Sequence, residues 1–307
     1  MNQLLKGYTI LDFSHRLPGP LAGLNLSLMG AKVIKVEDQE FGDPFLSGAF
    51  KDFDDSFVQW YQELNKGKEI KKLDFNALDI KELVKVLLLK TDGVILALPP
   101  KVRLKLGLDA ESLKNLGKNI AVVELGASST VKQSMHDLNA LALSGLLDLH
   151  VFNRNEDIID PPFLPVSGIA FGQNVATQIL AGILESYKTN KLSYSQCFLH
   201  DTTEHLLTPF WPKAVKATGR KKFLHNGVYP CYTIYRTKDG KHVALAAVED
   251  KFWEGLCKTF PVTLDISKRF ETKKENFELM AAVFKKFTAH EISEMTKDLD
   301  LCLSLIN

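Results

Sequence analysis

The sequence lacks the features that mark exported, membrane-spanning or disulfide-rich proteins. It contains only four cysteines in 307 residues, namely Cys197, Cys231, Cys257 and Cys302. They have neither CxxC spacing nor a histidine in ligand register, which argues against a disulfide framework and a zinc site. No apolar run reaches transmembrane length, and the N-terminal stretch has neither the charged region nor the cleavage site of a signal peptide. We therefore expect a cytoplasmic protein with reduced thiols.

An excess of charge of either sign is also missing, with 38 basic against 37 acidic residues. This balance predicts no general attraction to nucleic acid or to an anionic membrane. A dinucleotide fingerprint is absent, because the nearest glycine pattern, GPLAG at 19–23, has the wrong spacing for GxGxxG. With 45% hydrophobic residues, the chain has the composition of an ordinary globular protein. Any anionic ligand must therefore meet a local group of cations.

Short β-rich runs alternate with helix-length segments over the first two thirds of the chain. The runs are YTILDFS (8–14), AKVIKVE (31–37), DGVILALPP (92–100) and NIAVVELGA (119–127). Runs that are apolar on both faces and separated in this way predict an α/β fold with a doubly wound, parallel, Rossmann-like sheet. Between the first two runs, a helix is predicted to begin at a Gly-Pro turn and to end at Gly30 as a C-cap.

The pattern changes after the basic cluster GRKK (219–222). The stretch GVYPCYTIYRTKDGKHVALAAVE (227–249) predicts two strands joined at Asp239 and Gly240, because Asp-Gly is a strong hairpin signal. Helical patterns follow at 250–259 and 273–299. We therefore expect a large Rossmann-like domain with a linker helix over 1–220, and a small α+β domain over 221–307.

Several longer stretches form motifs in a fixed order. They are ILDFSHRLPGPLAGLNLSLMGAKVIKVEDQEFGDPF (10–45), LNKGKEIKKLDF (64–75), KVRLKLGLDAESL (101–113), HDLNALALSG (136–145) and HNGVYPCYTIYRTKDGKHVALAAVEDKFWEGL (225–256). Together they resemble the class III CoA-transferase family, which includes CoA-transferases and α-methylacyl-CoA racemases. The last two stretches are most similar to the racemase branch.

The resemblance implies a CoA thioester as substrate or ligand, with no tightly bound cofactor and no metal. Such a ligand carries phosphates and a long pantetheine arm, so its site needs local cations and an extended groove. The cations at matching positions are Lys66, Lys68, Lys71, Lys72, Arg103 and Lys105. Lys105 stands where the racemases place a basic residue against the CoA phosphates. The alternative for 66–72 is a solvated loop, which is what most runs of charge are.

The family carries out two reactions, and the resemblance leaves both open. Its CoA-transferases are expected to use an aspartate nucleophile, which forms a mixed anhydride and then an aspartyl-CoA thioester on the way to an acid acceptor. Its racemases are expected to keep the thioester intact. They move the α-proton of a 2-methylacyl-CoA, with a histidine on one face, an aspartate on the other and an enolate between.

His136 matches the racemase histidine, at the start of a predicted helix whose dipole favours a neutral imidazole. Asp137 beside it is assigned to CoA binding, and the alternative is that the pair only caps this helix. Glu249 matches a glutamate thought to support the racemase histidine across a subunit boundary. The alternative for Glu249 is a surface carboxylate at a strand end.

The family aspartate is missing from this sequence. The transferase register through VSGIAFGQN (166–174) places Gln173 at its position, whereas the racemase register places Gly168 there. No acidic residue lies between Asp160 and Glu185. Because a glutamine amide is neither a nucleophile nor a proton carrier near neutral pH, the transferase mechanism is not expected in its family form. One-sided proton abstraction by His136 and CoA binding without turnover both remain open.

Two further departures bear on the site and on assembly. The glycine-rich loop expected before the histidine is replaced by GASSTVKQSM (126–135). The chain ends at LCLSLIN (301–307), before the tail with which relatives interlock two subunits. We expect a homodimer that acts on a small-molecule acyl-CoA, without nucleic acid or membrane partners. The two subunits are expected to be less firmly interlocked than those of the relatives.

Overall fold

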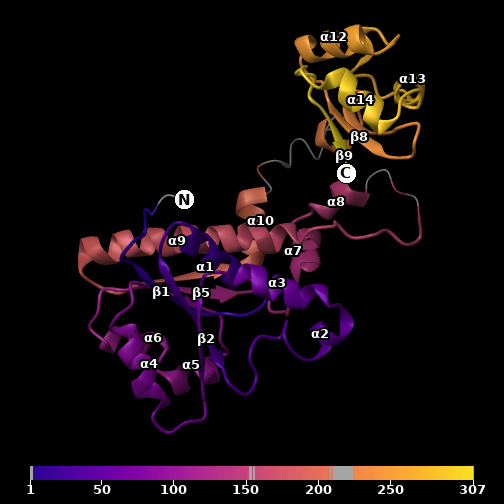
Figure 1. The fold of residues 1–307 in the computed structure, drawn as a ribbon. Helices are drawn as coiled ribbons and strands as arrows, with labels where there is room; N and C mark the ends of the chain where they lie inside the picture. The colour runs from indigo at the N-terminus through magenta and orange to yellow at the C-terminus, as the bar shows by residue number, and fades with distance from the viewer. Residues whose placement is uncertain (1–2, 152–153, 155, 208, 210–223, 307) are drawn as a thin grey trace. The chain divides into compact units, whose positions relative to one another are not determined.

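The computed structural model describes residues 3–151, 154, 156–207, 209 and 224–306 (Figure 1). The chain divides into two compact units, Met1–Trp211 and Pro212–Asn307. The domain boundary expected at 220 and the GRKK cluster lie outside the described residues, so that boundary stays a prediction. Among the described residues, none of the helices combines the length and the apolar character that crossing a bilayer requires.

The first unit is built on a parallel sheet of six strands in the order β3-β2-β1-β4-β5-β6. The strands are β1 (Thr9–Phe13), β2 (Lys32–Asp38), β3 (Glu69–Leu73), β4 (Gly93–Leu96), β5 (Ala121–Gly126) and β6 (Ser193–Phe198). The strand order reverses between β1 and β4, where Ile10 pairs with Gly93. This arrangement confirms the predicted doubly wound sheet.

Helices cover both faces of this sheet. The helices of the first unit are α1 (Pro18–Leu28), α2 (Ala49–Phe53), α3 (Ser56–Leu64), α4 (Ile80–Leu88), α5 (Pro100–Leu106), α6 (Ala110–Asn115), α7 (Asp137–Leu143), α8 (Leu147–Val151), α9 (Val166–Thr189) and α10 (Leu199–Leu207). Figure 1 shows α1 and α9 on one side of the sheet and α4, α5 and α6 on the other. Each side encloses its own apolar core, so both faces of the central strands are buried.

The contact between α1 and α9 positions the loops at one edge of the sheet. α1 begins at Pro18, before the predicted Gly-Pro start, and Gly30, which was predicted as the C-cap, follows the C-cap residue Met29 with φ of 100°. Gly172 on α9 lies so close to α1 that a Cβ there would stand 2.8 Å from the carbonyl oxygen of Pro18. This close approach places the N-terminus of α9 beside the loop that follows β1.

The second unit contains the antiparallel sheet β7-β8-β9 and its helices. Its elements are η3 (Leu224–Asn226), β7 (Tyr232–Arg236), β8 (His242–Ala246), α12 (Asp250–Thr259), η4 (Ile266–Lys268), α13 (Lys274–Phe284), α14 (Ala289–Thr296) and β9 (Leu303–Ile306). The hairpin prediction is confirmed, since β7 pairs with β8 and Gly240 has φ of 81° in the turn. Trp253, Phe260 and Phe284 lie in the core of this unit.

Candidate functional site

A cavity of about 670 Å³ lies where the strand order of the large sheet reverses. Its wall includes His15, Ala97 and Ala127, each of which follows the carboxyl end of a strand, namely β1, β4 and β5. In open α/β sheets, ligands bind in the crevice at this reversal point. The topology of the sheet therefore marks the cavity as the place for a ligand.

Most of the cavity wall is apolar. Four aromatic rings, those of Phe45, Phe50, Phe57 and Trp60, form a cluster with neighbouring centroids 5.0 to 6.2 Å apart. They come from the loop after β2 and from α2 and α3. Such a surface suits an apolar group, while a few polar side chains fix its orientation.

Arg16 lines the cavity with a backbone conformation that non-glycine residues seldom adopt, with φ of 62°. Its backbone N–H donates to both carboxylate oxygens of Asp43, at 3.3 and 3.1 Å. The same carboxylate accepts the backbone N–H of Phe45 at 3.0 Å. The Arg16 guanidinium lies 5.7 Å from the ring centroid of Phe50. Asp43 therefore fixes the two loops that follow β1 and β2.

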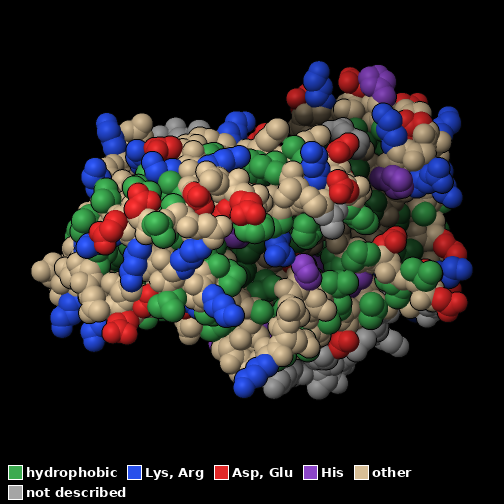
Figure 2. Space-filling view, turned by 90° about the horizontal axis from the view of Figure 1, so that it is seen from below, with side chains coloured by type: hydrophobic (Ala, Val, Ile, Leu, Met, Phe, Trp, Pro, Cys, Tyr) green, Lys and Arg blue, Asp and Glu red, His purple; other side chains and the backbone are tan. Residues whose placement is uncertain are grey.

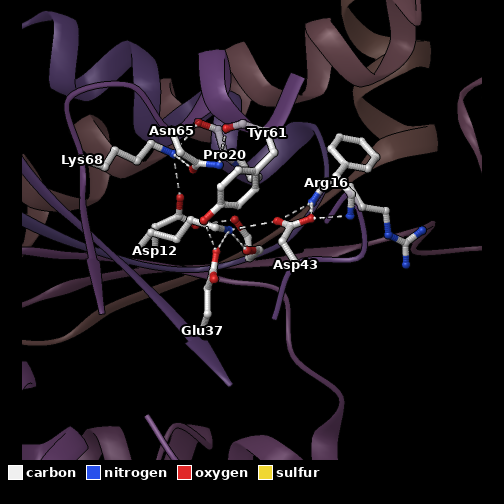
Figure 3. A network of polar contacts seen from close by, with 11 residues as sticks. Asp12, Arg16, Pro20, Glu37, Asp43, Tyr61, Asn65 and Lys68 are labelled. Carbon is white, nitrogen blue, oxygen red and sulfur yellow. Dashed lines mark hydrogen bonds and ion pairs between the residues drawn. The ribbon is translucent and has the colours of Figure 1, made fainter. Parts of the chain in front are cut away.

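A buried ion network lies behind these loops (Figure 3). Lys35 Nζ lies 3.2 Å from Asp43 and 3.8 Å from Glu37, and all three side chains are fully buried. Lys35 also donates to the carbonyl oxygen of Ser14 at 2.6 Å, and the Tyr61 hydroxyl donates to Glu37 at 2.8 Å. Buried charges are tolerated only when they are paired in this way, so the network anchors the loops.

Lys68 belongs to the same buried region. Its Nζ donates to Asp12 at 3.0 Å, to the Pro20 carbonyl at 2.8 Å and to Asn65 at 3.0 Å, and its side chain has no exposed surface. Gly23 on α1 leaves the space for it, since a Cβ there would lie 2.8 Å from Nζ. Every donor of its ammonium is thus already used within the protein, and CoA binding by Lys68 stays a prediction.

Burial raises the pKa of Asp12, but the charges of Lys68 and Lys35 outweigh burial and hold that pKa below its usual value. The Ser14 hydroxyl donates to the same carboxylate and acts in the same direction. Asp12 is therefore a permanent anion at neutral pH.

The other predicted cations are not brought to one place. Arg103 forms an ion pair with Glu124 at 2.6 Å in a separate cavity of about 560 Å³. Lys105, two residues further along α5, instead contacts Asn76, since residues two apart leave a helix on different sides. Lys66 is exposed beside Glu63, at 3.6 Å.

Lys71 is half-buried on β3, whereas Lys72 and Lys105 are exposed. Figure 2 shows basic and acidic side chains interspersed over the visible face, without a broad area of one sign. Among the predicted phosphate ligands, Lys72 and Lys105 are therefore the ones that are exposed and have no acidic partner in the described part of the chain.

The structure brings His136 and Asp137 to the cavity wall. His136 is the N-cap residue of α7, with an exposed side chain, and its backbone N–H donates to Asn139 Oδ1 at 3.0 Å. Asp137 is half-buried, and its Oδ1 accepts the backbone N–H of Gly168, the third residue of α9, at 2.7 Å. Burial raises the pKa of Asp137, and the backbone hydrogen bonds from Gly168 and Ser167 offset only part of this increase.

The two registers for the missing aspartate lead to different places. Gly168 lies in the cavity wall beside Asp137. Gln173 is exposed on α9 and does not line this cavity. The racemase register therefore reaches the cavity, and the transferase register does not bring Gln173 to His136.

Glu249 lies in the second unit, as the N-cap residue of α12, and its side chain is exposed. Its backbone carbonyl accepts the N–H groups of Phe252 and Trp253 at 3.1 Å each. A role for Glu249 beside His136 stays a prediction.

Sequence reasoning missed Arg16, Asp43 and the aromatic cluster as parts of the site. For Arg16 the signal is position, because it follows a buried strand at the carboxyl edge of the sheet. For Asp43 it is the Gly-Asp-Pro sequence at 42–44, which belongs to the first of the stretches that carry the family resemblance. The aromatic cluster has no comparable signal, since its members are spread between 45 and 60.

Comparison with known proteins identifies the family to which this chain belongs. The model of CoA-transferase family III matches residues 5–307. The chain is 26% identical over 299 residues to human succinyl-CoA:glutarate CoA-transferase, covering 92% of this chain and 67% of that one. It is 24% identical over 314 residues to human α-methylacyl-CoA racemase, covering 98% and 77%. It is 28% identical over 271 residues to a CaiB/BaiF CoA-transferase family protein of Caenorhabditis elegans, covering 85% and 74%.

Solved structures agree on the fold. A CaiB/BaiF family protein from Brucella suis matches with a TM-score of 0.79 and 20% identity, covering all of this chain and 85% of the other. Rv3272 from Mycobacterium tuberculosis matches with a TM-score of 0.72 and 22% identity, covering 99% and 82%. With a family model that spans residues 5–307, the chain belongs to CoA-transferase family III.

Proposed function

We propose that this protein binds an acyl-CoA with its acyl group in the cavity at the strand reversal, and that His136 moves the proton on the carbon next to the thioester. The observation that carries the proposal is the place of His136. Its side chain is exposed in the wall of a mostly apolar cavity, beside Asp137 and Gly168. One relative is named as a racemase of α-methylacyl-CoA, and a 2-methylacyl-CoA is the substrate proposed here.

The chemistry follows from the acidity of a carbon next to a thioester. A neutral imidazole takes the α-proton, and the C–H electron pair moves into the thioester carbonyl to give an enolate. Returning a proton to the opposite face inverts the centre. An apolar wall helps because it excludes water and strengthens each polar interaction in the site.

Lys72 and Lys105 are proposed to hold the CoA phosphates. Both side chains are exposed, and Lys105 contacts Asn76, just beyond the carboxyl end of β3. The protein is further proposed to be a cytoplasmic homodimer in which Glu249 supports the histidine of the partner subunit.

A second candidate is acyl-CoA binding without turnover. The absence of a side chain at Gly168, where the racemase register expects an aspartate, favours it. A third possibility, CoA transfer to a carboxylic acid, is named in several of the relatives. It is disfavoured here, because the transferase register offers the exposed amide of Gln173 in place of a nucleophilic carboxylate.

The test is α-proton exchange. The protein is incubated with a 2-methylacyl-CoA in deuterium oxide, and deuterium at Cα is followed by mass spectrometry. Incorporation is expected for the native protein, and His136→Ala is expected to lose about 100-fold or more of it for the epimer that His136 deprotonates. His242→Ala is the matched control, because His242 is an exposed histidine on β8.

Binding is measured separately by calorimetry with the same thioester. Binding without incorporation would replace the first candidate with the second. Failure to bind any CoA species would contradict both.

A further inference from the structure

The cavity contains a carboxylate next to the position from which the family aspartate is missing. A Cβ built on Gly168 would lie 3.7 Å from Asp137 Oδ1. The backbone N–H of Gly168 donates to this same oxygen at 2.7 Å. The carboxylate of Asp137 therefore lies in contact distance of the point from which a side chain at position 168 would start.

We propose that Asp137 is the second acid–base group of the site and replaces the carboxylate that the sequence lacks at position 168. This inference rests on the proposed function, since it assigns the partner of His136 in the same proton transfer. It differs from the role that the sequence predicted for Asp137, which was CoA binding or helix capping.

The local backbone allows neighbouring residues to serve as two separate groups. His136 is extended, with φ of −107° and ψ of 175°, before α7 begins at Asp137. Successive side chains leave an extended chain on different sides. Both side chains nevertheless line the cavity, His136 from the start of α7 and Asp137 where it meets the N-terminus of α9.

The surroundings of Asp137 suit a group that gains and loses a proton. In the part of the chain that the structure describes, no lysine, arginine or histidine forms an ion pair with it. Its partners are backbone N–H groups, and burial raises its pKa. A half-buried carboxylate without a cation holds its proton more readily than an exposed one, which favours a general acid.

The proton balance closes without another reactant. In one direction, neutral His136 takes the α-proton, and the C–H electron pair moves to the thioester oxygen as an enolate. The protonated Asp137 then gives its proton to the opposite face of Cα, and the electron pair returns to form the new C–H bond. The site ends with an imidazolium and a carboxylate, which is the state that runs the opposite direction.

The experiment separates the two epimers of a 2-methylacyl-CoA in deuterium oxide. Asp137→Asn removes the proton but keeps an oxygen that can accept the Gly168 N–H, so it preserves the contact with α9. The native protein is expected to exchange both epimers. Asp137→Asn is expected to keep exchange of the epimer that His136 deprotonates, and to lose exchange of the other by about 100-fold or more. His136→Ala is expected to show the opposite selectivity.

A rescue variant sharpens the test. Asp137→Asn combined with Gly168→Asp moves the carboxylate back to the family position. A Cβ at 168 would meet the Cδ2 of Leu17 at 2.8 Å, which is the mobile end of a side chain. We expect the double variant to recover at least about tenfold in exchange of the lost epimer. Asp137→Asn with Gly168→Asn is the matched control and should recover nothing.

The outcomes distinguish the inference from the function on which it rests. Exchange of both epimers by Asp137→Asn at near-native rates would overturn the inference and leave the proposed function standing. Equal loss of both epimers would also overturn it, because that pattern marks a positioning role. Absence of exchange in the native protein would instead reject the proposed function itself.

Discussion

Asp12 and Asp137, two carboxylates of the first unit, lie in opposite electrical surroundings. Asp12 is fully buried and receives a hydrogen bond from Lys68 at 3.0 Å, whereas Asp137 is half-buried and is held by backbone N–H groups. The more deeply buried group has the lowered pKa, and the less buried group has the raised one. A neighbouring cation, more than the depth of burial, therefore decides which carboxylate is a fixed anion and which can carry a proton.

Replacing Lys68, the cation beside Asp12, should have the largest effect on the contrast between Asp12 and Asp137. Lys68→Met leaves a buried carboxylate without its partner and is expected to lower the free energy of unfolding by about 3 to 5 kcal/mol. Urea unfolding followed by circular dichroism measures the change. Lys66→Met is the matched control, since Lys66 is exposed two residues away and should change stability by less than about 0.5 kcal/mol. Equal effects of the two variants would contradict a buried Asp12–Lys68 pair.

Acid titration of stability tests the charge on Asp12. Because its pKa is lowered in the folded protein, its contribution is present above its usual value of 3.8 and is lost as the pH falls through the folded pKa. Each extra proton bound by the unfolded chain gives a slope of about 1.4 kcal/mol per pH unit. Asp12→Asn should therefore show a shallower loss of stability below about pH 4 than the native protein. Unfolding curves at a series of acidic pH values would contradict this if their slopes coincide.

Changes at Asp137 should affect stability less. Asp137→Ala removes the acceptor for the Gly168 N–H and is expected to cost about 1 kcal/mol, whereas Asp137→Asn keeps an acceptor and should cost much less. A raised pKa has the opposite sign to that of Asp12, because its contribution is present at low pH and is lost as the pH rises through the folded pKa. Thermal unfolding from pH 4 to pH 8 should therefore favour Asp137→Asn, relative to the native protein, at the upper end.

The smallest effects are expected for the exposed lysines Lys72 and Lys105. Lys72→Ala and Lys105→Ala should each weaken CoA binding by about two- to fivefold at low salt, since exposed charge pairs contribute less than about 1 kcal/mol. Raising the ionic strength should reduce these effects. Calorimetry at two salt concentrations measures them, with Lys66→Ala as a control that should leave the affinity unchanged. If Lys66→Ala weakened CoA binding more than Lys72→Ala and Lys105→Ala do, the phosphate contacts would be assigned to Lys66 instead.

The central strands could be predicted because they are apolar on both faces: β1, β4 and β5 fall within the predicted runs, and β2 extends one residue beyond its run. The strands that sequence reasoning missed, β3, β6 and β9, lie at sheet edges and carry mixed sequences such as EIKKL and SYSQCF. An edge strand is hydrogen-bonded to a neighbouring strand on one side only and has a more exposed surface, so its hydrophobic pattern is weak.

The candidate site was predictable where a local motif carries it and unpredictable where distant segments meet. HDLNALALSG located His136 and Asp137, which the structure places in the cavity wall. The run of lysines gave no sign that Lys68 is buried against α1. This burial depends on the space that Gly23 leaves and on the negative charge of Asp12. The contact between Asp137 and Gly168 joins residues 31 positions apart, which no local pattern encodes.

The hold of Asp43 on the backbone of Arg16 and Phe45 has a consequence for ligand affinity. Ordering a loop when a ligand arrives costs conformational entropy and weakens the complex. Here the two loops that face the cavity are already fixed from the core side, and the positive φ of Arg16 is held by the same carboxylate. The ligand therefore meets a preorganised surface, and the free energy of its contacts is available for affinity instead of being consumed in arranging the protein around it.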